Sequence, residues 1–444
     1  MKHKLNKSLI REVALERKIP ITDLILNSLN QNSEKYHKNM TFFGVCPNSI
    51  SVVKSALRSA KRFNAPMMFV ATLNQVDLDG GYTGWTQRDF VEVVRGEAEK
   101  IDFKGPIIIA LDHGGPWLKD KQAMENWSLH DAMDGVKKSL VASLEAGYDL
   151  LHIDPTVDKT LPKGETIKVE TVVERTLNLI EHVEAARRER NLPKISYEVG
   201  TEEVHGGLAD LNTFRNFLKG LKSGLSKRGL DDTWPCFIVG KVGTDLHTTE
   251  FDPKTAKMLV DIAREYGSYI KGHYTDYVSN PQDYLKVGMG GANVGPEFSH
   301  AEFDSLERLT KIEEELIEKG KVIKPSGFML ILTKSIIDSG RWKKWLLNSE
   351  IGKDFSGLSN DRQKWLLQTC SRYVWTQKAV VKARSKLYEN LKDQCIDGDE
   401  IVLRGIDEVM KKYFVSFNLK NSSSKIERIL KNEKCGIHPI TFST

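Results

Sequence analysis

Eight short apolar runs alternate with longer amphipathic segments through the first two thirds of the chain. The runs cover residues 40–46, 67–72, 106–112, 148–154, 194–200, 235–243, 267–273 and 283–290. Continuous hydrophobicity at this length is typical of strands buried on both faces of a parallel sheet. The intervening segments, such as 51–63, 132–147 and 170–190, have helical periodicity. A strand followed by a helix, eight times, predicts an α/β fold of the (β/α)₈ barrel type.

A doubly wound open sheet would produce the same alternation of strands and helices. The count of eight runs favours the barrel, as does the absence of a G-x-G-x-x-G motif after the first run. Past about residue 300 only helical patterns are found. We therefore predict a helical lead-in over 1–39, a barrel over 40–300 and a C-terminal helical extension over 301–444. The extension is expected to form a cap or an oligomerisation surface, so a homo-oligomer is expected.

The composition excludes several classes of protein. A net charge of +5 over 444 residues, with scattered lysines, does not indicate nucleic-acid binding. No window approaches eighteen apolar residues, so no membrane span is expected. Five cysteines, an odd number and widely separated, are typical of reduced thiols. The first twenty residues lack the apolar core of a secretory signal, and we expect a cytoplasmic protein.

Polar residues with catalytic potential stand at the ends of several runs. Catalytic groups of barrels lie at the carboxyl ends of the strands, and Asp112 and His113 follow the third run. His247 and His273 follow the sixth and seventh runs. Three imidazoles that converge on the barrel mouth predict a site for a divalent metal with a position left open for substrate. Asp112 would serve in proton transfer, whereas we interpret His152 as a hydrogen-bonded residue of the barrel.

Other polar and glycine-rich strand ends are candidates for binding a substrate. Backbone amides after strands 7 and 8 of barrels often bind a phosphate, and the segments "HYTDY" and "KVGMGG" occupy that place in the predicted order. The candidates for substrate or phosphate binding are Asn74, Gln75, Gly81, Asp154, Asp276, Lys286, Gly288 and Gly290.

Several motifs, in order along the chain, carry a family resemblance. "NQV…GGYTG", "LDHGGPW", "SYEVGTEEVHGG" and "GHYTDYV" resemble the subunit of tagatose-1,6-bisphosphate aldolase that is usually called non-catalytic. The resemblance covers roughly residues 40–300 and continues faintly through "SRYVWTQKAVVKA". It implies a relation to the class II fructose-bisphosphate aldolases, which are zinc-dependent barrels.

The resemblance also implies roles for individual residues. Asp112 matches a catalytic acid/base, and His113 matches a metal ligand, with His247 and His273 as the further ligands. Either Glu198 or Glu202 matches a glutamate near the metal. The segments "ALDHGGPW", "TDLH" and "EVHGG" depart from the family pattern, and they lie in loops expected to contact the substrate.

Three functions remain open from the sequence. The first is a metal-dependent enzyme of ketose or ketose-phosphate metabolism that acts by retro-aldol chemistry through an enediolate. The second is a 4-epimerase of ketoses or their phosphates on the same site. The third is an inactive structural subunit that supports a separate catalytic aldolase subunit.

Overall fold

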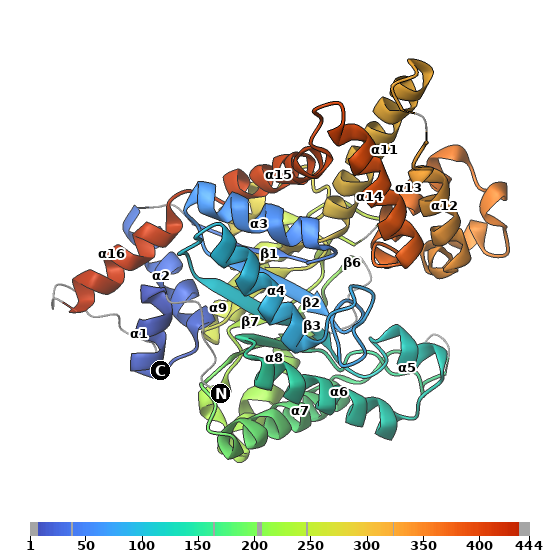
Figure 1. The fold of residues 1–444 in the computed structure, drawn as a ribbon. Helices are drawn as coiled ribbons and strands as arrows, with labels where there is room; N and C mark the ends of the chain where they lie inside the picture. The colour runs from blue at the N-terminus through green and yellow to red at the C-terminus, as the bar shows by residue number, and fades with distance from the viewer. Residues whose placement is uncertain are drawn as a thin grey trace.

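A closed barrel of eight parallel strands forms the centre of the molecule (Figure 1). The computed structural model describes residues 8–36, 39–162, 165–201, 207–245, 247–322 and 324–434. The strands are β1 (Phe42–Val45), β2 (Met67–Thr72), β3 (Ile107–Gly114), β4 (Leu150–Ile153), β5 (Ser196–Gly200), β7 (Phe237–Val239), β9 (Tyr269–Gly272) and β10 (Gly291–Val294). They close in the order β1-β10-β9-β7-β5-β4-β3-β2, which confirms the predicted barrel.

The predicted position of the eighth strand is wrong. Asp283–Val287 forms the short helix α10, which buries Tyr284 and Val287 and ends at Gly288 in a left-handed conformation. The strand itself is the next segment, β10, whose Gly291 lies opposite Phe42 of β1. A five-residue segment with three apolar residues, followed by glycine, fits a single capped helical turn as well as a strand, so local hydrophobicity did not distinguish them.

The helices that cover the barrel begin and end at recognisable caps. Ser49 caps α3 (Ile50–Phe63) by accepting a hydrogen bond from the backbone N–H of Val52, and Asn64 ends it in a left-handed conformation. Ser128 and Gly147 do the same for α6. The other helices between strands are α4 (Gln87–Lys100), α5 (Asp120–Met124), α6 (Leu129–Ala146), α7 (Val169–Glu189), α8 (Leu211–Lys227) and α9 (Pro253–Glu265).

Two short strands outside the barrel, β6 (Gly207–Leu208) and β8 (Val242–Gly243), pair with each other in an antiparallel manner. β8 follows directly after β7, so the chain leaves the barrel wall there. Because the chain leaves the wall after β7, the residues that follow this strand do not continue along the barrel.

The N-terminal helices α1 (Leu9–Arg17) and α2 (Ile21–Tyr36) pack at the amino-terminal end of the barrel. The buried guanidinium of Arg11 donates to both carboxylate oxygens of Asp149, at 2.6 and 3.0 Å, and to the carbonyl oxygen of Ile107. Asp149 and Ile107 stand at the starts of β4 and β3. A buried arginine with a bidentate carboxylate partner therefore joins the lead-in to the barrel.

The C-terminal extension packs along the barrel and over its carboxyl end. It comprises α12 (Phe328–Asp338), α13 (Asn360–Cys370), α14 (Lys378–Lys392), α15 (Gly398–Ser416) and α16 (Ser422–Lys434), and it follows α11 (Pro296–Glu318). Helix α15 lies against α3 and α11, where Phe414 stacks on Phe63 with ring centroids 5.0 Å apart (Figure 1). Helix α16 reaches back to contact α1 and α2.

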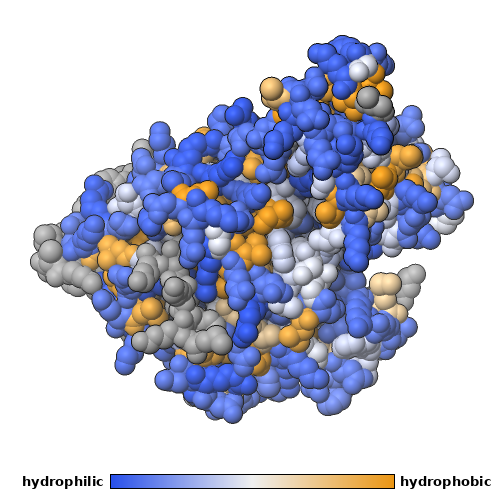
Figure 2. Space-filling view, in the orientation of Figure 1, coloured by the Kyte–Doolittle hydropathy of each residue, from blue (hydrophilic) through white to orange (hydrophobic). Residues whose placement is uncertain are grey.

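The surface of the molecule is mostly hydrophilic on the face shown in Figure 2, with hydrophobic residues in scattered groups. Within the described part of the chain, every helix is too short or too polar to cross a membrane.

Candidate metal centre and its cavity

The carboxyl end of β3 carries an acid and an imidazole followed by two glycines that the packing requires. His113 has a left-handed φ of 52°, and the pairing of β3 with β4 shifts register between Leu111 and Gly114. A Cβ on Gly115 would lie 1.8 Å from the carbonyl oxygen of Asp154, and one on Gly114 would lie 2.6 Å from that of His152. Only glycines therefore allow the chain after β3 to pass this close to the end of β4.

Four residues from three strands form a compact group of potential metal ligands, namely Asp112, His113, His152 and His273. One ligand atom from each lies within 4.8 Å of those from the others. His273 Nδ1 lies 3.2 Å from His113 Nε2 and 3.7 Å from Asp112 Oδ1. The three imidazole ring centroids are 4.9 to 5.2 Å apart. We call these four residues the His/Asp cluster.

Carboxylates outside the cluster orient its imidazoles. His113 Nδ1 lies 2.6 Å from Asp154 Oδ2, and His273 Nε2 lies 2.9 Å from Glu198 Oε1. With their other ring nitrogens held by these carboxylates, His113 Nε2 and His273 Nδ1 face each other inside the cluster, and in the neutral form of each ring that nitrogen presents its lone pair to the cluster. A carboxylate behind each imidazole is the usual arrangement around metal-binding histidines.

The charges of the site shift the pKa values of its members. Burial lowers the pKa of His113, but Asp112 and the hydrogen bond with Asp154 outweigh this and raise it to about 9. Burial raises the pKa of Asp112, yet the neighbouring His113 and His273 hold it well below its usual value. Burial is the main reason that the pKa of His273 is lowered. Asp112 is therefore ionised across the physiological range.

A cavity of about 300 Å³ opens above the cluster. Its barrel wall includes Asp112, His113, Asp154, His273, Asp276 and Asn293, and the loop after β2 adds Asn74, Gln75 and Tyr82. The extension contributes Arg341, Lys344, Trp345, Arg372 and Tyr373. Sequence reasoning missed these residues of the extension, although "SGRWKKW" and "SRYVW" were visible as basic and aromatic segments. Nothing local to them indicates that they lie over the barrel mouth.

The polar residues of the β2 loop hold one another in place. Asn48 Oδ1 accepts hydrogen bonds from Gln75 Nε2 at 3.0 Å and Tyr82 Oη at 2.9 Å. Asn74 donates to the carbonyl oxygen of Leu118 at 3.0 Å. Gly81 has a φ of 52°, and a Cβ there would lie 2.3 Å from the carbonyl oxygen of Gln75, so Gly81 shapes the loop and does not line the cavity.

His247 is not brought to the cluster. It lies exposed beyond β8, with its ring 5.2 Å from that of Trp365 in α13, because the chain leaves the barrel wall after β7. His152 of β4 is a buried, hydrogen-bonded residue of the barrel, as interpreted from the sequence, and its Nδ1 atom lies 3.1 Å from Asp112 Oδ1. It also stands in the cluster, in the place expected for His247, a position that the sequence interpretation did not assign to it. One feature of the sequence could have indicated this position of His152. His152 and Asp154 are two residues apart, and this spacing puts both side chains on the same face of the strand.

Glu198 lies behind His273 and not in the cavity wall. It is fully buried, and its second carboxylate oxygen accepts a hydrogen bond from Lys271 Nζ at 2.6 Å. Its contacts are those of a residue that positions His273. The alternative candidate, Glu202, lies outside the described residues.

The predicted phosphate-binding segment lies at the opposite end of the barrel. Lys286 is exposed and pairs with Asp283 at 2.6 Å. Gly288 ends α10 beside Arg264, and the backbone N–H of Gly290 donates to the carbonyl oxygen of Ile270 before β10 begins. The expectation that Lys286, Gly288 and Gly290 stand at the carboxyl end of strand 8 is wrong, because the strand begins only after them.

The fold and the sequence are similar to those of known proteins. A probable tagatose 6-phosphate kinase from Sinorhizobium meliloti 1021 is 20% identical, with 85% of this chain and 100% of that chain covered and a TM-score of 0.69. A fructose-bisphosphate aldolase from Campylobacter jejuni is 13% identical, with 90% and 96% covered and a TM-score of 0.49. The similarity to the Sinorhizobium meliloti protein shows that the two chains have a common fold. Residues 26–420 match the sequence model of a family described as D-tagatose-1,6-bisphosphate aldolase subunit GatZ/KbaZ-like, and the chain belongs to this family.

Proposed function

We propose that this protein is a divalent-metal-dependent enzyme that acts on a ketose or ketose phosphate by retro-aldol chemistry. The observation that carries the proposal is the His/Asp cluster at the floor of a cavity, with Asp154 and Glu198 behind two of its imidazoles. Family membership supports the class of substrate.

The residues present fit a divalent metal, and zinc in particular. Three imidazoles are ligands that zinc prefers, and three protein ligands leave a position open for substrate and Asp112 free for proton transfer. His152 Nε2 is buried without a hydrogen-bond partner among the described atoms, and a nitrogen in that state needs a further partner. A metal bound here would act as a Lewis acid towards the substrate carbonyl and stabilise the negative charge that develops when a C–C bond breaks.

The protein's own groups account for proton transfer. Asp112 is ionised, and its Oδ2 atom has only one distant contact, 3.5 Å from Asn293 Nδ2. It can therefore accept the proton of a substrate hydroxyl as the C3–C4 bond of a ketose breaks, and return it when the bond forms. Asn293 lines the cavity beside Asp112, with its Nδ2 atom 3.5 Å from Asp112 Oδ2, so this amide group can donate a hydrogen bond to a second substrate hydroxyl.

The volume of the cavity suits a small substrate. About 300 Å³ is at the lower end of the range for ligand pockets, roughly 300–1,000 Å³. Residues of the extension cover part of the opening.

If the aldehyde leaves after bond cleavage, the reaction is that of an aldolase. If it turns over within the cavity and recombines, the reaction is 4-epimerisation.

The first experiment measures metal content and turnover of the purified protein. Metal is quantified by plasma mass spectrometry, and the protein is incubated with tagatose and fructose, their 6-phosphates and their 1,6-bisphosphates, with and without chelator. Release of triose is followed by a coupled dehydrogenase and C4 epimers by NMR. We expect one divalent metal per chain and chelator-sensitive turnover.

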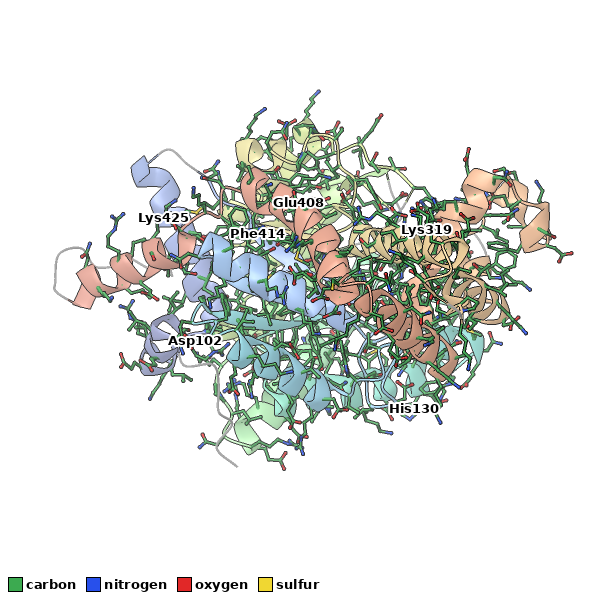
Figure 3. The ribbon with its side chains drawn as sticks, turned by 45° about the horizontal axis from the view of Figure 1, so that its top comes forward. Asp102, His130, Lys319, Glu408, Phe414 and Lys425 are labelled. Atoms are coloured by element: carbon green, nitrogen blue, oxygen red, sulfur yellow. The ribbon has the colours of Figure 1, made fainter. Side chains whose placement is uncertain are left out.

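The ligand assignment is tested with two histidine variants. His152→Ala is expected to lose metal and turnover, whereas His130→Ala keeps both, because His130 lies exposed at the molecular surface (Figure 3). A protein without bound metal or turnover of its own would overturn the proposal and favour the role of a supporting subunit for a catalytic aldolase. Metal retained in His152→Ala would overturn the ligand assignment.

A further inference from the structure

Arg372 is a buried cation without an anionic partner at the cavity. It follows α13, is 6% exposed, and lies over the rings of Trp345 and Tyr373. Its Nη2 atom donates to Tyr373 Oη at 3.1 Å, and its Nη1 atom is buried without a partner among the described atoms. No carboxylate in the described part of the chain forms an ion pair with it.

The other well-buried arginines of the molecule are paired. Arg11 has Asp149 at 2.6 Å, and Arg384 has Glu302 at 2.7 Å. Burial of a charge without a partner is costly, so buried charged groups are normally paired. The contrast indicates that the partner of Arg372 comes from outside the chain.

Two further cations line the cavity beside Arg372. Arg341 and Lys344 both pair with Asp120, at 2.5 and 2.7 Å. Three cations and one carboxylate leave two positive charges in this group, which we call the basic cap. A phosphate monoester carries about −1.5 to −2 charges at pH 7, so a phosphate matches the basic cap better than a carboxylate does.

The usual phosphate position of a barrel is occupied by the protein itself. The backbone N–H groups of Gly295 and Glu297, after β10 and at the start of α11, both donate to Asp276 Oδ1, at 3.0 and 2.7 Å. The N–H of Tyr277 donates to Glu297 Oε2 at 2.8 Å. These three amides are therefore not available to a phosphate.

We propose that the basic cap binds the phosphate of a ketose phosphate whose carbonyl end lies at the His/Asp cluster. The proposal rests on the proposed function and narrows its substrate to a phosphorylated sugar. It also assigns the C-terminal extension a direct part in substrate binding, with Arg372 as the principal residue and Arg341 and Lys344 as supporting ones.

Equilibrium binding tests this without turnover. Calorimetry measures fructose 6-phosphate, fructose, fructuronate and inorganic phosphate, in the presence of chelator. We expect the sugar phosphate to bind more tightly than the neutral sugar and the sugar acid. Arg372→Met is expected to weaken its binding about 10- to 100-fold, the scale of a lost charged hydrogen-bonding partner. Arg372→Lys, which keeps the charge, is expected to weaken it less.

Two control variants keep the outcomes distinct. Lys286→Met removes an exposed lysine at the other end of the barrel and is expected to leave binding unchanged. His152→Ala is expected to retain phosphate binding while it loses metal, so failure of the metal proposal can be told apart from failure of this one. Equal affinity for fructose and its phosphate, tighter binding of fructuronate, or unchanged phosphate binding in a folded Arg372→Met and Arg341→Met would each overturn the proposal.

Discussion

Replacement of Lys271 by methionine is expected to destabilise the protein strongly through the charge it leaves behind. Lys271 Nζ and Glu198 Oε2 are 2.6 Å apart, and both side chains are fully buried. Without the ammonium group, the carboxylate keeps only His273 Nε2 as a partner, at 2.9 Å. Removal of one member of a buried ion pair costs about 3–5 kcal/mol, and we expect a loss of unfolding free energy in that range.

The same pair predicts that the two changes are not additive. Glu198→Gln alone leaves Lys271 unpaired and is expected to cost a similar amount. The double variant contains no unpaired charge and is expected to lose no more than about 2 kcal/mol, well below the sum of the single losses. A double-mutant cycle measured by urea unfolding, followed by circular dichroism, gives the coupling free energy directly.

A matched control and a clear negative outcome complete this experiment. Lys54 pairs with Asp399 at 3.4 Å, with side chains 31% and 45% exposed, and Lys54→Met is expected to cost less than about 1 kcal/mol. If Lys271→Met costs no more than this control, or if the losses of the two single variants simply add in the double variant, the buried-charge reasoning is refuted.

Three further predictions concern the site, the lead-in and the extension. Gly115→Ala puts a Cβ 1.8 Å from the carbonyl oxygen of Asp154, so we expect a lower melting temperature and less bound metal. Burial raises the pKa of Asp23 to about 6 from 3.8, so ionisation of Asp23 lowers the free energy of unfolding of the wild type as pH rises. Urea unfolding should therefore show that Asp23→Asn gains stability relative to the wild type between pH 4 and 7, by at most about 3 kcal/mol. Phe414→Ala removes a ring stacked on Phe63 between extension and barrel, and urea unfolding should show a loss of about 3–5 kcal/mol (Figure 3).

Each of these has a result that would contradict it. Gly96→Ala, at a helix position with nothing within 4 Å of the new Cβ, serves as the control for Gly115→Ala, and equal effects of the two would contradict the close-approach argument. A stability difference for Asp23→Asn that does not change with pH would show that Asp23 titrates as in the unfolded chain. A loss below about 1 kcal/mol for Phe414→Ala would show that the extension does not depend on this contact.

Local patterns in the sequence were sufficient for most of the fold. Seven of the eight strands coincide with apolar runs, because a strand buried on both faces must be apolar throughout. The same reasoning placed Asp112, His113 and His273 at strand ends, and barrel closure brings these ends together. It was not sufficient for the eighth strand, since a capped helical turn and a short strand have the same hydrophobicity over five residues.

From the sequence, strand and helix periodicity favoured a barrel over an open sheet and put an acid–imidazole pair at the end of its third strand. Which histidine joins His113 and His273 depended on the packing of the folded chain, because β4 stays in the wall beside Asp112 while the chain after β7 leaves it. The packing also decided that Arg372, some 260 residues beyond Asp112, lies over the same cavity. Periodicity reports the environment of a residue within its own strand or helix, whereas neighbours across the barrel depend on closure, register and the docking of distant helices.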